Sequence, residues 1–297
     1  MIDSKVVESI RALSSEDKEG FDQFLLSPYF QKGFSVNELR TFFHYIIAAL
    51  DAPHTTSFSK ENVYELLFPA KPFSQSRMDR IMFELNRLVQ VFLQIKTYLK
   101  RENEVQRLLD WSIYQRKGGN QFPYEKQLQK TWAEIEALDL SLTEGFFKSY
   151  QTAKENHEWL SSFNRVKGDL GIPKVLHYLD LFYYTQKLEL LNRYQLQQKA
   201  TLITPSETIQ RDLFTFKIPE HYTREHPELT ILEKIHELFQ PEVPSPNGFR
   251  ELMDMLAVLE NRLTAEELFQ VYAYLRSYCA ILIDAGFAEF NVILHEI

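Results

Sequence analysis

The residues of this chain that could do chemistry form no recognised catalytic pattern. The phosphate-binding loops GxGxxG and GxxxxGKS/T, the nucleophile motif GxSxG and the zinc motif HExxH do not occur. Carboxylates are abundant, but a sequence alone pairs no two of them for acid–base catalysis. The chain therefore gives no positive sign of an enzyme, and we expect no catalytic residue, no cofactor and no metal site.

Histidine and cysteine, the usual ligands of zinc, are also spaced unfavourably. His221 and His226 flank the sequence YTRE, and residues five apart do not lie on one face of a helix, so this pair predicts no metal site. His44 and His177 each fall on a predicted helix, and we interpret both as structural histidines. Cys279 is the single cysteine, which excludes an internal disulfide and fits a reducing compartment. Its apolar surroundings, YLRSYCAILI, indicate a buried core thiol.

The composition is ordinary for a soluble globular protein, with 44% apolar and 25% charged residues among 297. The net charge of −8 argues against general nucleic-acid binding. Residues 75–126 hold 10 Lys and Arg against 6 Asp and Glu, whereas residues 219–297 hold 5 against 14. Both segments are candidate partner surfaces, or simply solvated helix faces. Residues 2–13 are charged throughout, and no apolar run approaches the roughly 20 residues that span a bilayer, so we expect a cytoplasmic protein without membrane association.

Nearly every segment has a helical period, and the stretch 171–202 is the one around which the others would be arranged. Its larger apolar stripe consists of Val175, Leu176, Leu179, Phe182, Tyr183, Leu190 and Tyr194. Its smaller stripe, nearly opposite, consists of Leu181, Tyr184, Leu188 and Leu191. A helix with two apolar stripes must be covered twice, so we predict an inner helix with neighbours on both sides.

A second run has the most regular spacing in the chain. Its apolar residues follow at intervals of 3, 4, 3, 4, 3 and 4: Met78, Ile81, Leu85, Leu88, Phe92, Ile95 and Leu99. This spacing predicts a long amphipathic helix. Further apolar residues widen its face beyond a coiled-coil seam, so we expect it to pack within the chain. Capping boxes at Ser35–Glu38 and Thr264–Glu267 predict two further helix starts.

These elements predict an all-α protein in two parts. The glycine pair in Lys117–Asn120 is the best candidate boundary, because glycines break a helical pattern. We predict an N-terminal helical domain at 1–117 and a TPR-like stack of helical hairpins, an α-solenoid, at 121–297. No fixed period is present, so the repeat is divergent.

The C-terminal end carries an apolar pattern that continues beyond Gly286 to Ile297 without a polar cap. A terminal repeat normally presents a polar outer face. We therefore expect either a longer array that is truncated here or self-association through this end.

Several sequence motifs resemble those of uncharacterised proteins of Bacteroidetes. These motifs are SPYF at 27–30, ELLFPAKPF at 65–73, MDRIMFELNRLVQVFL at 78–93 and YLRSYCAILIDAG at 274–286. Such proteins are all-helical and TPR-like, and they are often longer than this chain. Because the shared motifs are structural, the resemblance implies a helical array and no site residues.

The segment Phe58–Gln94 is similar to the helix–turn–helix part of bacterial activators that join a winged helix to a TPR-like domain. Arg77, Arg80 and Arg87 fall on one side of its second helix, where arginines could meet phosphates or base edges. The other interpretation is a solvated face with pairs such as Arg80–Glu84. The wing hairpin that such a domain needs is not visible in the sequence.

Two functional hypotheses follow. The first is a non-catalytic scaffold or adaptor that binds a protein or peptide on its helical stack. The second is a DNA-binding regulator that reads DNA through Arg77, Arg80 and Arg87, with the stack as sensor or dimerisation domain. The absence of catalytic motifs and the negative charge favour the first.

Overall fold

The computed structural model describes residues 4–30, 33–51, 59–119, 121–162, 168–201, 215–240 and 243–296. In these ranges the chain forms helices and no β-strand, which confirms the all-α fold class. Phe58, Leu202 and Ile297, each an end of a segment discussed above, lie outside the described residues. The chain divides into two compact units, Met1–Asn103 and Glu104–Ile297.

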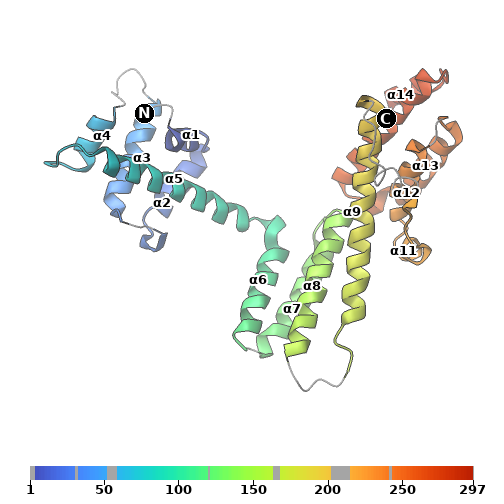
Figure 1. Cartoon of the computed structure of the whole chain (residues 1–297), viewed down its shortest axis with the longest axis horizontal. Helices are drawn as coiled ribbons and strands as arrows, with labels where there is room; N and C mark the ends of the chain where they lie inside the picture. Colours follow the sequence, from blue (N-terminus) through green and yellow to red (C-terminus); the bar gives the residue numbers. More distant parts are fainter. Residues whose placement is uncertain are drawn as a thin grey trace. The chain divides into compact units, whose positions relative to one another are not determined.

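The first unit is a cluster of short helices around one long helix, drawn in blue to teal in Figure 1. Its elements are α1 (Lys5–Arg11), α2 (Ser15–Phe24), the 3₁₀ turn η1 (Pro28–Phe30), α3 (Val36–Asp51), α4 (Lys60–Leu67), α5 (Gln75–Tyr98) and the 3₁₀ turn η2 (Arg101–Asn103). The capping box predicted at the start of α3 is present, since Ser35 and Glu38 exchange backbone-to-side-chain hydrogen bonds of 2.7 and 3.2 Å.

Helix α5 supplies the apolar face around which the first unit packs. Met78, Ile81, Leu85 and Leu88 are fully buried in one core with α1, α2, α3 and α4. Burying each such side chain contributes about 1.5–3 kcal/mol. The predicted packing within the chain is thus confirmed for the first two thirds of the stripe, whereas Leu99 at its end is 62% exposed.

The second unit contains the remaining helices, drawn in green to red in Figure 1. They are α6 (Glu104–Lys117), α7 (Gln121–Ala137), α8 (Leu142–Ser162), α9 (Ile172–Thr201), α11 (Glu220–Glu225), α12 (Leu229–Phe239), α13 (Pro246–Leu259), the 3₁₀ turn η3 (Glu260–Arg262), α14 (Ala265–Asp284) and α15 (Phe290–Glu296). Figure 1 shows α7, α8 and α9 side by side, and the later helices lie along α9, with α11 beside its N-terminal half and α12 packed on it. The predicted capping box Thr264–Glu267 opens α14.

The unit division differs from the predicted boundary at Lys117–Asn120. Helix α6 packs on α7 and α8, so the pair Gly118-Gly119 forms a turn between two helices of the second unit. Gly119 has a φ of 72°, a left-handed conformation that glycine adopts without strain. Such a turn ends a helix whether or not a domain ends there, and Asn120 itself lies outside the described residues.

Helix α9 has neighbours as predicted, but only one of its two stripes is covered by them. It packs on α8 and α12, and Leu181 and Leu188 of the smaller stripe are buried. The larger stripe is partly bare, because Leu176 and Tyr183 are 53% and 49% exposed. The prediction that both stripes are covered is therefore wrong. The covered face of α9 also contains buried polar residues, which a search for apolar positions alone does not find: Thr185, Asn192 and Gln195.

The C-terminal helices form a core of their own, and most of the terminal apolar pattern lies in it. Phe290 is fully buried there, and Phe287, Ile293 and Leu294 pack against it. Cys279 is fully buried in the same core, which confirms the predicted core thiol. Among the described residues of α15, Val292 is a large apolar side chain that faces outward, with 63% of its surface exposed.

Candidate functional site

The exposed side of α9 is the first candidate site. Its solvent-facing apolar side chains are Ile172, Leu176, Leu179, Tyr183 and Leu190, which we call the α9 stripe. Their spacing of 4, 3, 4 and 7 keeps them on one helix face over about 27 Å, at 1.5 Å per residue. Single exposed apolar residues are ordinary, whereas a contiguous row of them is typical of an interaction surface.

Two lysines of α9 are held by aromatic rings, one beside the α9 stripe and one on the opposite side of the helix. The Lys174 ammonium is 3.8 Å from the centre of the Trp132 ring. The Lys187 ammonium is 4.7 Å from the centre of the Phe216 ring and donates a hydrogen bond of 3.2 Å to the Tyr183 hydroxyl. Cation–π contacts of this kind fix a flexible side chain in place. Lys187 therefore places one positive charge beside the α9 stripe.

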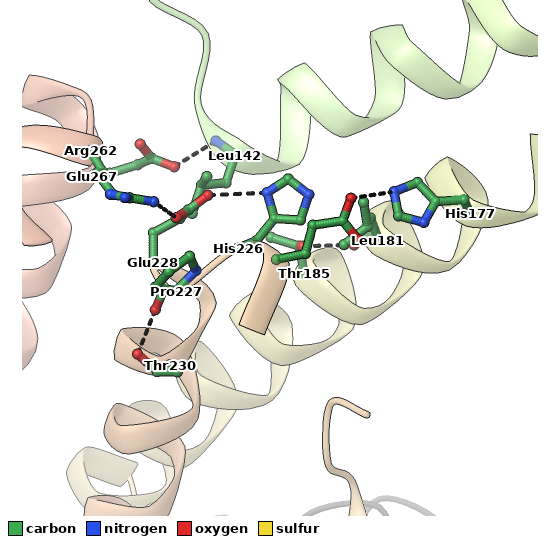
Figure 2. A network of polar contacts seen from close by, with 11 residues as sticks. Leu142, His177, Leu181, Thr185, His226, Pro227, Glu228, Thr230, Arg262 and Glu267 are labelled. Atoms are coloured by element: carbon green, nitrogen blue, oxygen red, sulfur yellow. Dashed lines mark hydrogen bonds and ion pairs between the residues drawn. The ribbon is translucent and has the colours of Figure 1, made fainter. Parts of the chain in front are cut away.

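A polar network where α8, α9, α12 and α14 meet is the second candidate site (Figure 2). The Glu228 carboxylate accepts from His226 Nδ1 at 3.3 Å and from Arg262 at 3.4 Å. Glu267 accepts from the backbone N–H of Leu142 at 2.6 Å while it closes the capping box of α14. These bonds join the starts of α8, α12 and α14, with the Glu228 side chain only 10% exposed and that of Arg262 52% exposed.

Burial and hydrogen bonding act in opposite directions on the carboxylates of this region. Burial raises the pKa of Glu228, but hydrogen bonds from His226 and Arg262 outweigh it, and the pKa is lowered overall. Burial likewise raises the pKa of Glu189, and there the hydrogen bond from Thr143 only partly offsets it. The surroundings of Glu228 therefore stabilise its anionic form, whereas those of Glu189 destabilise the anion relative to the neutral acid.

A histidine cluster lies at one side of this network. Three ligand atoms, one each from His177, Glu225 and His226, lie within 4.8 Å of one another. His177 Nε2 is 3.7 Å from Glu225 Oε1. Along the sequence, His226 is nearest to His221, and His177 is expected to be a structural histidine. The fold instead brings His226 to a residue of α9 almost fifty positions earlier, and no local spacing signals this.

An enclosed cavity between α9, α12 and α14 gives no room for an organic substrate. Its volume is about 20 Å³, and Glu189, Arg193, Glu228 and Tyr274 are among the residues that line it. That volume accommodates about one water molecule.

The arginines of the DNA-binding alternative lie on α5, where two of them already have anionic partners. The Arg77 guanidinium is 3.3 Å from Glu38 and 4.2 Å from the centre of the Phe68 ring. Arg87 donates to Glu84 at 2.6 and 2.9 Å and to the Phe30 carbonyl at 2.5 Å. Arg80 is exposed. Contact with phosphates would require Arg77 and Arg87 to leave these partners.

Comparisons with known proteins assign no function to this chain. No family model, no curated protein and no solved structure matches this chain. Among the described helices, none combines the length and the apolar character needed to cross a membrane.

Proposed function

We propose that this chain is a non-catalytic interaction scaffold that binds an amphipathic helix of a partner protein along the α9 stripe. The observation that carries this proposal is the row of exposed apolar side chains on α9. Helix-in-groove recognition uses anchors at i, i+3, i+4 and i+7, and the α9 stripe offers the complementary surface with matching spacing. The adjacent Lys187 favours a partner helix with an acidic residue beside its apolar face.

We further propose that the helices which bear the α9 stripe belong to a divergent TPR-like stack. Sequential helices pack on one another from α6 to α9 and from α12 to α15, as stacked hairpins do. The single, buried cysteine is consistent with a reducing compartment, and it supports our proposal of a cytoplasmic location. The resemblance to all-helical, TPR-like proteins of Bacteroidetes likewise remains a prediction.

Photo-crosslinking from the centre of the α9 stripe tests the proposal. A photoreactive phenylalanine analogue replaces Tyr183 in the full chain, and cross-linked peptides from cells of the source organism are sequenced. We expect one partner segment with apolar residues at helical spacing and an acidic residue beside them. Leu176→Glu with Leu190→Glu should abolish its cross-linking, because charges on the stripe cannot be buried against an apolar face.

Val258→Glu is the matched control, since Val258 is 75% exposed on α13 and lies outside the stripe. This variant should cross-link like the parent chain. Cross-linking that the two stripe charges leave unchanged would contradict the proposal. Cross-links only to a second copy of this chain, or only to nucleic acid, would replace it with self-association or with the regulator.

A further inference from the structure

The histidine cluster has the composition of a metal site. We propose that His177, Glu225 and His226 bind a divalent transition-metal ion, for which Zn²⁺ is the natural probe. Two imidazoles and one carboxylate form a donor set found in zinc sites that keep an open coordination position. Zn²⁺ at 2.0–2.1 Å from tetrahedral ligands places those ligand atoms about 3.3 Å apart. The 3.7 Å between His177 Nε2 and Glu225 Oε1 is close to that value.

The rings are held in position by neighbours on several elements. The His177 ring contacts Tyr178 and Tyr222, with centres 5.1 and 5.6 Å apart. The His226 and Phe146 rings are nearly perpendicular, and their centres are 4.9 Å apart. Side chains fixed in this way lose little conformational entropy when they take up an ion. The three ligand atoms lie within 4.8 Å of one another, so small side-chain rotations would bring all three to bonding distance of one shared ion.

Glu228 gives His226 the orientation that metal-binding histidines usually have. Its carboxylate can only accept at the 3.3 Å contact, so His226 Nδ1 carries the proton and Nε2 keeps its lone pair. Figure 2 shows the second ring nitrogen of His226 on the side that faces His177. Arg262 in turn anchors Glu228 at 3.4 Å. A carboxylate behind the imidazole is the usual outer partner of a zinc-bound histidine.

The donor set also selects the kind of ion. Imidazole nitrogens favour Zn²⁺, Co²⁺, Ni²⁺ and Fe²⁺, whereas Ca²⁺ and Mg²⁺ prefer sites made of oxygen ligands. A bound ion would join α9 to the junction of α11 and α12, because His177 lies on α9 and the other two ligands lie at that junction. The fourth position would remain for water. This inference does not rest on the proposed function.

Titration of the full chain with Zn²⁺ followed by calorimetry tests the site. We expect one ion per chain and a rise in the thermal midpoint of roughly 5–10 °C at a hundredfold excess over Kd. Co²⁺ should give visible absorption bands of a mixed nitrogen–oxygen site. Mg²⁺ and Ca²⁺ at the same concentrations should change neither readout.

Variants locate the bound ion. His177→Ala and His226→Ala should each weaken Zn²⁺ binding by about 100-fold, and Glu228→Gln by about tenfold. His221→Ala is the matched control, since His221 lies on α11 outside the cluster, and it should bind like the parent. Circular dichroism of each variant without metal verifies that it is folded. If a histidine variant is not folded, Glu225→Gln replaces it as the ligand variant, because glutamine has the same shape as glutamate. Unchanged binding in the ligand variants, or no binding by the parent chain, would overturn the site.

Discussion

At the scale of single residues, the second unit is distinguished by polar side chains that are enclosed by its helices. Thr143 donates to Glu189 at 2.7 Å, and Asn192 and His236 are almost fully buried. A buried polar group is tolerated when it is hydrogen-bonded, and a buried charge costs more than a buried neutral group. At Glu189 the hydrogen bond from Thr143 compensates this cost only in part, because burial still raises the pKa of its carboxyl group.

Glu189→Gln should therefore stabilise the protein at pH 7. Burial raises the pKa of Glu189, so its contribution to stability is fully present below the ordinary carboxyl pKa and is lost as pH rises through the folded value. Glutamine carries no charge and can still accept from Thr143. We expect a gain of about 0.5–1 kcal/mol at pH 7 that vanishes near pH 4, measured by urea unfolding. Glu289→Gln, at an exposed position, should show no such pH dependence. A gain that is equal at both pH values would refute this account of Glu189.

At the scale of elements, α9 is attached to α12 by side-chain polarity as well as by apolar packing. Asn192 Nδ2 donates to the Leu232 carbonyl at 3.0 Å, and His236 Nδ1 donates to Asn192 Oδ1 at 3.0 Å. Because Asn192 is fully buried, each of these bonds has no competition from water. This pair of bonds fixes which residues of the two helices face one another.

Asn192→Ala should destabilise the chain by about 2–3 kcal/mol, because it removes both bonds and leaves a cavity where a fully buried side chain packs. Chemical unfolding followed by circular dichroism measures the change. Gln197→Ala, on the exposed side of α9, is the control and should stay within about 0.5 kcal/mol of the parent. Equal effects of the two changes would mean that the bonds between α9 and α12 contribute little.

At the scale of the whole molecule, the location of the unit boundary has energetic consequences. Helix α6 buries Val105, Leu108 and Leu109 within the second unit. Arg116 donates to Glu155 of α8 at 2.8 and 3.1 Å, and the Glu155 side chain is only 6% exposed. Removing one partner of a buried ion pair leaves an uncompensated charge, which costs about 3–5 kcal/mol.

Fragments 1–103 and 104–297 should each fold, whereas fragment 118–297 should be less stable than 104–297 by at least about 3 kcal/mol. Urea unfolding of the separate fragments measures the difference. Arg116→Met in 104–297 isolates the part that comes from the ion pair. A fragment 118–297 as stable as 104–297 would place the boundary at the glycine pair after all.

The sequence by itself determined what depends on near neighbours along the chain. Helical periodicity predicted the all-α class and the buried α5 face from Met78 to Leu88, and cap residues located the starts of α3 and α14. These features follow from interactions within a turn or two of helix, so a local pattern contains the information.

Only the tertiary structure decided which surfaces and side chains meet. Periodicity shows that a face of α9 is apolar but not that a neighbour covers it, and the larger stripe is the exposed one. The meeting of His177 with His226 depends on how α11 returns to α9, a contact between residues far apart in sequence. The unit boundary likewise depends on what α6 packs against, and a glycine turn has the same local sequence in either case. Packing between distant segments, which no local spacing records, is the physical reason for all three.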